Sequence, residues 1–109
     1  MENTFKLKTK ANVGVTTVGI YTAPAATTTV VIGITLSNTS GSGVNVGVGI
    51  TRAGTTEDVK LLKNAPIPQG SSLEFMGGNK VVLETNDQIN VDSDTNNSVD
   101  AALTIMEIT

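Results

Sequence analysis

The densest group of oxygen ligands in the sequence lies in one short segment near the C-terminus. Three aspartates and two asparagines fall within the run Asp92-Ser93-Asp94-Thr95-Asn96-Asn97-Ser98-Val99-Asp100. Carboxylate and amide oxygens are ligands that Ca²⁺ prefers, and the order Asp-x-Asp-x-Asn matches the start of an EF-hand loop. The match then fails, because Asn97 replaces the glycine of the turn and Leu103 replaces the closing glutamate. We therefore predict a solvated turn between two strands, with no metal and no other cofactor.

A second group of acids suggests glycoside hydrolysis, which uses a pair of carboxylates. Its members are Glu57, Asp58, Asp87 and Asp92. Sugar-binding sites normally also present aromatic rings, but the chain has only two Phe, one Tyr and no Trp. We therefore predict no enzyme and no catalytic residue. A glycan- or receptor-binding module remains an alternative, because its fold class would match.

The composition excludes other classes of function. The chain of 109 residues contains no His and no Cys, which removes imidazole acid–base catalysis, thiolate nucleophiles, disulfides and the usual zinc sites. Its net charge of −3 and pI near 4.7 are not those of a typical nucleic-acid binder. The N-terminus is polar, and the longest apolar run, 30–34, is too short to cross a bilayer. We expect neither a nucleic acid nor a membrane as partner.

Residue types and their alternation indicate an all-β fold. The sequence has 17 Thr, 13 Val and 8 Ile, so about a third of it is β-branched. Short alternating segments are separated by Gly, Asn, Ser and Pro. We predict a single antiparallel β-sandwich of seven or eight strands over residues 1–109, jelly-roll or immunoglobulin-like. Residues 1–12 are expected to form an extended N-terminal arm.

Two neighbouring segments carry the clearest alternation. In 28–37, Val30, Ile32, Ile34 and Leu36 share one face, and in 44–50 the even-numbered residues are apolar. The loop 38–43 between them has the composition of a hairpin turn, so we predict that these strands pair. A further strand is expected over 13–21, and a turn at 77–79.

Glycines and lysines mark two candidate contact surfaces. Gly33, Gly47 and Gly49 lie opposite the apolar stripes, which is typical of a face that another backbone approaches closely. That face would be covered by another subunit or by the N-terminal segment of the chain itself. Lysines at positions 6, 8 and 10 share one face of an extended strand, and they would dock an acidic partner or keep an edge strand soluble.

Most of the chain resembles a known group of proteins. The segments that carry the resemblance are 3–9, 20–25, 61–75, 78–84, 87–91 and 98–108. They are similar to small structural β-sandwich proteins of tailed marine phages, the cyanophage-like proteins of head decoration, neck or tail. The resemblance implies a virion protein without enzymatic activity.

Within that resemblance we expect a capsid decoration or cement protein that stabilises the head by contacts with the major capsid protein. A neck or tail component in contact with other virion proteins is the alternative. The expected symmetric setting and the glycine face also predict self-association, with a trimer as the expected form.

Overall fold

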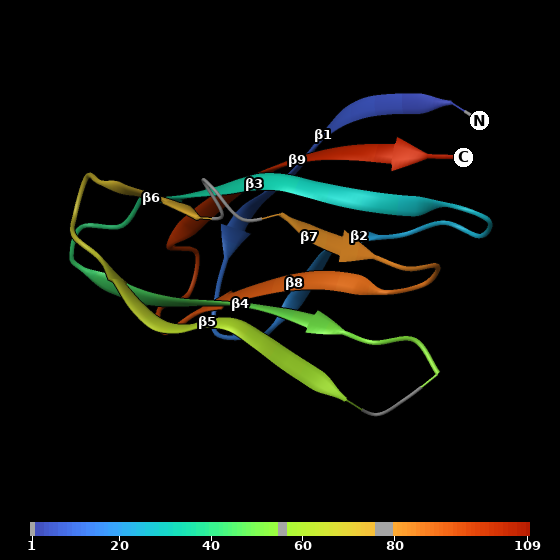
Figure 1. The fold of residues 1–109 in the computed structure, drawn as a ribbon. Helices are drawn as coiled ribbons and strands as arrows, with labels where there is room; N and C mark the ends of the chain where they lie inside the picture. The colour runs from blue at the N-terminus through green and yellow to red at the C-terminus, as the bar shows by residue number, and fades with distance from the viewer. Residues whose placement is uncertain (1, 55–56, 76–79) are drawn as a thin grey trace.

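The computed structural model describes residues 2–54, 57–75 and 80–109, which form two antiparallel sheets packed face to face (Figure 1). The strands are β1 (Asn3–Val13), β2 (Val18–Thr22), β3 (Thr28–Asn38), β4 (Val44–Thr51), β5 (Asp58–Ile67), β6 (Ser72–Phe75), β7 (Val81–Leu83), β8 (Gln88–Ser93) and β9 (Val99–Ile108). The described residues thus contain nine strands, against seven or eight expected, and the predicted β-sandwich is confirmed. None of them forms a helix long and apolar enough to cross a membrane. The turn expected at 77–79 lies outside the described residues.

The strand order is that of a jelly roll. One sheet has the order β1-β9-β3-β6, with β7 also paired to β3, and the other has the order β2-β8-β4-β5. The pairs are nested, because the first strand pairs with the last, the second with the last but one, and β4 with β5. Such nesting arises when a long two-stranded ribbon is wrapped into two layers. The strand order therefore selects the jelly roll of the two expected topologies.

The predicted hairpin between 28–37 and 44–50 is wrong, because β3 and β4 belong to different sheets. The connection crosses from one layer to the other and is held by the buried Asn38. Its side-chain amide donates to the carbonyls of Ser42 at 2.8 Å and Ile67 at 2.9 Å. Its side-chain oxygen accepts the N–H of Ser40 at 2.9 Å. These bonds replace the ladder that a hairpin would have formed.

A β-bulge in β3 changes the face on which its apolar residues lie. The register with β9 shifts between Val31 and Gly33, so Ile32 is the extra residue. Before the bulge Val31 points into the core, and after it Ile34 and Leu36 do so. The single predicted stripe was therefore correct only after the bulge.

The N-terminal residues also differ from the prediction. Residues 3–13 do not project as an arm but form β1, which pairs with β9 from Asn3 to Val13. The strand expected over 13–21 is divided, because β1 ends at Val13 and β2 begins at Val18. A bulge occurs between Lys10 and Val13, where Asn12 has a φ of 59° that asparagine tolerates better than most residues.

The core lies between the two sheets and consists of aliphatic side chains from both. Its largest fully buried members are Ile34, Leu36, Ile67, Leu83, Ile89, Leu103 and Ile105. Most core residues alternate along their strands, and their neighbours in sequence point outward. The outward side chains of each sheet are therefore available for other roles.

Candidate interaction surface

The three aspartates of the 92–100 segment point to different partners. Their hydrogen bonds run from Thr17 Oγ1 to Asp92 Oδ2 at 3.0 Å, from Asn45 N–H to Asp94 Oδ1 at 3.1 Å and from Asn12 N–H to Asp100 Oδ1 at 3.0 Å. Serines close the turn itself, since Ser93 Oγ and Ser98 Oγ lie 2.7 Å apart. No group of three or more acidic residues converges on a common point within the described residues. The segment is a polar turn after β8, and its hydrogen bonds connect that turn to β1 and β4.

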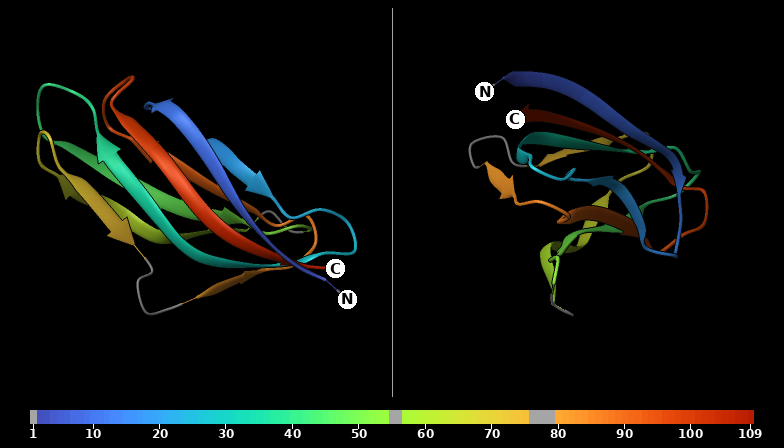
Figure 2. Two further views of the ribbon diagram at one scale, coloured as in Figure 1. Left: turned by 90° about the horizontal axis from the view of Figure 1, so that it is seen from above. Right: turned by 90° about the vertical axis from the view of Figure 1, so that its right-hand side faces the viewer.

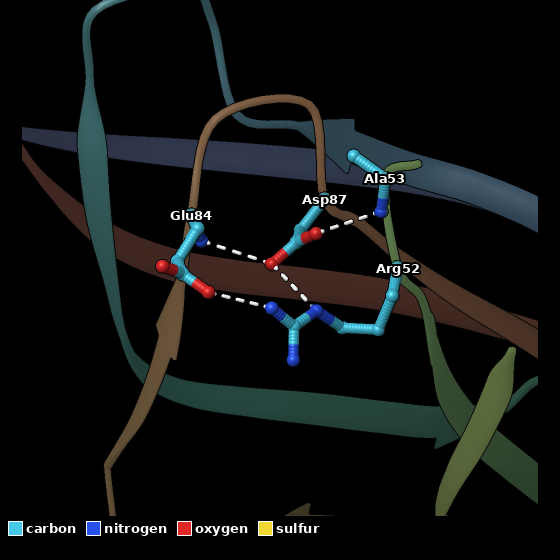
Figure 3. A network of polar contacts seen from close by, with 4 residues as sticks. All are labelled: Arg52, Ala53, Glu84 and Asp87. Carbon is cyan, nitrogen blue, oxygen red and sulfur yellow. Dashed lines mark hydrogen bonds and ion pairs between the residues drawn. The ribbon is translucent and has the colours of Figure 1, made fainter. Parts of the chain in front are cut away.

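The second carboxylate group is also divided. Asp87, only 2 % exposed, accepts the N–H of Ala53 at 2.9 Å and that of Glu84 at 3.0 Å. The Arg52 guanidinium forms ion pairs with both Asp87 and Glu84, as Figure 3 shows. Burial acts to raise the pKa of Asp87, but the two N–H donors and Arg52 outweigh it and hold that pKa below its ordinary value. Asp87 therefore remains ionised and joins the turn after β4 to the turn after β7.

Asp58 and Asp92 have partners elsewhere, whereas the charge of Glu57 acts on Arg52. Asp58 accepts the hydroxyl of Thr51 at 2.9 Å, and Asp92 also lies 3.8 Å from Lys60 Nζ. Each of these carboxylates thus has its own local partner. A glycosidase needs two acids on either side of one bond, and the contacts of Asp58, Asp87 and Asp92 describe separate structural attachments.

Sequence reasoning missed a buried polar cluster between β1, β2, β3 and β9. The Tyr21 hydroxyl donates to Glu107 Oε2 at 2.6 Å and lies 2.8 Å from Thr29 Oγ1. Lys6 Nζ is 2.9 Å from Glu107 Oε1. The only sequence signal was a glutamate in phase with apolar residues of the last strand, which predicts a buried acid.

The charge states of this cluster make it a structural element. The Tyr21 hydrogen bond, and next that of Lys6, lower the pKa of Glu107 against the opposing effect of burial. Burial, and next the bond to Glu107, raise the pKa of Tyr21 to about 12. At neutral pH the carboxylate is ionised and the phenol is protonated, so neither group exchanges a proton readily. The cluster therefore joins β1, β2, β3 and β9.

The three β1 lysines lie on the face that sequence alternation predicted, and that face turns inward. Lys6, Lys8 and Lys10 pair with Ile105, Leu103 and Ala101, all of which are buried. Residues directly opposite each other in adjacent strands share a face. Since β1 is the last strand of its sheet, the lysine side chains reach solvent along the open side of the sandwich. Lys8 Nζ lies 6.0 Å from the centre of the Tyr21 ring.

The glycine face is not one continuous open surface. An added Cβ at Gly47 would lie 2.6 Å from Asp92 Oδ1, and one at Gly49 would lie 3.0 Å from the Val59 carbonyl oxygen. Side chains and backbone of the neighbouring strands β5 and β8 therefore cover both positions, so the expectation of a contact surface there is wrong. Gly33 lies on the other sheet and is open, because the nearest atom to its added Cβ would be 3.8 Å away.

An exposed apolar surface lies on the outer face of the five-stranded sheet, meaning the side turned away from the four-stranded sheet. Phe5 pairs with Met106, Met106 with Val30, and Val30 with Val82, so these four side chains form one row across β1, β9, β3 and β7. Phe5 is 69 % exposed and Val82 is 56 % exposed. Leu7, 65 % exposed, lies beside the row on the same face. We call these five residues the apolar row.

The rest of the outer face carries few charges, and one of them is Glu74 of β6, which pairs with Thr35. On β1, β9 and β3 the residues of this face are odd-numbered 3–11, even-numbered 100–108, and 28, 30, 32, 33, 35 and 37. Asp100 is the only ionisable residue among them. Two open hollows of about 270 Å³ each lie over the small residues Ala102 and Gly33. The face therefore combines an exposed apolar row with two hollows, which is typical of an interaction surface.

A sugar-binding platform would need several exposed rings. Tyr21 is buried and Phe75 is half-buried, pairing with the inward-facing Ile34. Phe5 is the aromatic side chain that the described residues expose. The described residues contain no exposed aromatic cluster, which is the feature that would favour a glycan-binding module.

Solved structures share this fold at low sequence identity. No protein-family model and no curated protein sequence matches the chain. A chain of the T13 IBDV viral particle matches 96 % of this chain with a TM-score of 0.59 and 15 % identity, but the match covers only 30 % of that longer chain. A chain of the cyanophage Pam1 capsid asymmetric unit matches with a TM-score of 0.53 and 14 % identity over 96 % of this chain and 84 % of its own.

A chain of the disulfide-linked pili that form Bacillus endospore appendages matches with a TM-score of 0.53 and 14 % identity, over 100 % of this chain and 91 % of its own. At these identities the matches show a similar fold alone. The candidate surface of this chain must therefore be interpreted from its own residues.

Proposed function

We propose that this protein is a non-enzymatic structural subunit of a phage virion and that it binds other virion proteins through its outer face. The observation that carries the proposal is the uncharged apolar row on a rigid sheet. A preformed sheet loses little conformational entropy on binding, so apolar area buried there contributes efficiently to affinity. The fold shared with chains of two viral particles supports the same setting.

Within the virion we propose a capsid decoration or cement role, with a neck or tail position as the alternative. The match to the Pam1 capsid chain covers most of both chains, so that capsid component is also a small protein. The Bacillus neighbour supports a fibre less well, because those pili are disulfide-linked and this chain has no cysteine.

The size of the row favours attachment in several copies. Burying Phe5 or Leu7 fully contributes about 1.5–3 kcal/mol each, whereas association costs about 4–15 kcal/mol in lost freedom. One row therefore binds weakly, and linked copies bind much more tightly than single ones. This arithmetic supports self-association, with the trimer as the expected form, through contacts other than Gly47 and Gly49.

Quantitative mass spectrometry of purified particles that carry this gene product tests the location. A decoration protein should occur in a fixed, symmetric ratio to the major capsid protein. A copy number far below that of capsid subunits would instead indicate a neck or tail component. Absence from the particles would contradict the virion proposal, and binding in a glycan array would then favour the glycan- or receptor-binding alternative.

A pair of matched variants tests the surface. Val82 lies in the apolar row and Val15 lies in the turn after β1, and each is 56 % exposed. Val82→Ser should weaken re-binding to particles stripped of the protein, whereas Val15→Ser should leave it unchanged. Equal binding by both variants would show that the outer face is not the contact.

A further inference from the structure

The free edge of β1 is the longest regular strand edge among the described residues. β1 has 11 residues and lies at the end of its sheet beside β9 (Figure 2). The other edges are interrupted: β5 contains Pro66 and bulges, β2 has 5 residues with a bulge, and β6 has 4. Prolines, bulges, short length and charged side chains, above all lysines, are the usual protections of sheet edges. From Asn3 to Lys10 the edge of β1 has only the lysines, which a strand carrying acidic side chains would neutralise.

The hydrogen-bond pattern identifies which residues of β1 offer their backbone to a partner. Glu2 and Thr109 exchange both backbone hydrogen bonds, at 3.1 and 3.0 Å. In an antiparallel ladder such pairs alternate with pairs whose N–H and C=O groups point away from each other. The register is continuous to Lys10, so the outward groups belong to Asn3, Phe5, Leu7 and Thr9. These residues carry the N–H and C=O groups to which an added strand would bond.

The side chains on the two faces of this edge differ in character. Phe5 and Leu7 lie on the outer face, where a neighbouring strand would extend the apolar row. The three β1 lysines lie on the opposite face, beside the position that the partner's alternate side chains would take. A second copy of β1 would bring lysines against lysines, and like charges directly opposite are destabilising. Charge therefore favours an acidic strand over self-pairing.

We propose that the free edge of β1 receives an extended segment of another protein, in which apolar residues alternate with acidic ones. The apolar residues pack beside Phe5 and Leu7, and the acidic residues lie beside Lys8 and Lys10, since Lys6 is already paired with Glu107. Backbone bonds to four residues of β1 supply affinity, and the alternation supplies selectivity. The inference rests on the proposed function in so far as the partner is a virion protein.

Synthetic peptides of about nine residues, near the length of β1, test this inference with the full-length protein. One peptide alternates valine with glutamate, and its matched control alternates valine with lysine. Fluorescence anisotropy should show binding of the glutamate peptide at least tenfold tighter than that of the lysine peptide. Methylation of alternate backbone nitrogens of the glutamate peptide should abolish binding, because the added strand then loses its donors.

Two variants of the protein sharpen the test. Leu7→Pro removes an N–H that points away from β9, so it should block the peptide while preserving the β1–β9 ladder. If that variant fails to fold, Lys10→Glu keeps the test open. Lys10→Glu should lower the affinity for the glutamate peptide by about threefold to tenfold and raise the affinity for the lysine peptide. Lys63→Glu on β5 should change neither affinity.

Equal binding of both peptides, or of neither, would overturn the proposal of an acidic strand. Loss of self-association in Leu7→Pro without any peptide binding would also overturn it, by assigning the edge to a second copy. Normal incorporation of Leu7→Pro into particles would refute the edge contact and leave the proposed virion function standing. Absence of the protein from particles, with selective peptide binding retained, would refute the proposed function instead.

Discussion

Replacement by alanine should have opposite effects on stability at two glycines that both lie within strands. Gly33 and Gly49 both lie within strands, and neither has a positive φ. An alanine Cβ at Gly33 would have the Phe75 carbonyl oxygen at 3.8 Å as its nearest neighbour. At Gly49 it would lie 3.0 Å from the Val59 carbonyl oxygen and 3.1 Å from Asn90 Oδ1. The first contact is ordinary, whereas the second requires the backbone of β5 to move.

These distances set the expected free energies of unfolding. Gly33→Ala should stabilise the protein by about 0.5–1 kcal/mol, since alanine restricts the unfolded chain and suits a strand better than glycine. Gly49→Ala receives the same benefit but also an overpacking cost of about 1–3 kcal/mol. The net effect at Gly49 is a destabilisation of about 1–2 kcal/mol, which corresponds to a fall in Tm of about 4–12 °C.

Urea unfolding of both variants beside the wild type measures the difference. The slope of unfolding free energy against urea should be unchanged, so that the shift in midpoint reports stability alone. A Gly49→Ala variant as stable as the wild type would refute the reasoning, because moving β5 would then cost no more than the benefit of about 0.5–1 kcal/mol. A Gly33→Ala variant less stable than the wild type would contradict the inference that a side chain fits at position 33 without a clash.

The remaining predictions concern acid, metal and the apolar row. The pKa of Glu107 is lower in the folded than in the unfolded protein, so its contribution to stability is present above the unfolded pKa of about 4.5 and is lost as pH falls through the folded value. Urea titrations should therefore show a smaller acid-induced loss in Glu107→Gln than in the wild type, and an equal loss would contradict the assignment. Melting in EDTA and in millimolar calcium should agree within about 2 °C, and a larger shift would mean that the 92–100 segment binds the ion. Phe5→Ser should weaken re-binding to stripped particles without lowering the Tm, whereas unchanged re-binding would place the contact outside the apolar row.

Local alternation predicted the strands well but not their pairing. Composition and turn residues predicted the all-β class and located β3 and β4, because β-branched runs separated by Gly, Asn and Pro are typical of strands and turns. Pairing depends on the sheet to which each strand belongs. A loop such as 39–43 has the same composition whether it forms a hairpin within one sheet or crosses to the other sheet. The crossing depends on bonds from Asn38 to Ser42 and Ile67. Ile67 is distant in sequence, so no local pattern contains that information.

Bulges limited the prediction of faces in the same way. One extra residue at Ile32 reverses the inward phase of β3, and alternation counted along the sequence cannot detect it. The prediction of a contact surface at the glycines of β4 was wrong for a related reason. A glycine opposite an apolar stripe indicates a close neighbour, but that neighbour is the chain's own β5 backbone and the Asp92 side chain.

The orientation of β1 shows most clearly why the candidate surface required the structure. Its alternation of apolar residues with lysines is compatible with either face turned inward, and hydrophobicity alone would bury Phe5 and Leu7. The structure does the opposite, because β1 lies at the edge of its sheet and its inner face meets Glu107 and Tyr21. A lysine on that face pairs with a buried carboxylate and still reaches solvent, whereas Phe5 in the same place would leave Glu107 without its cation. The buried acid of β9 thus stabilises an arrangement in which the apolar residues of β1 face outward, where a partner can bury them.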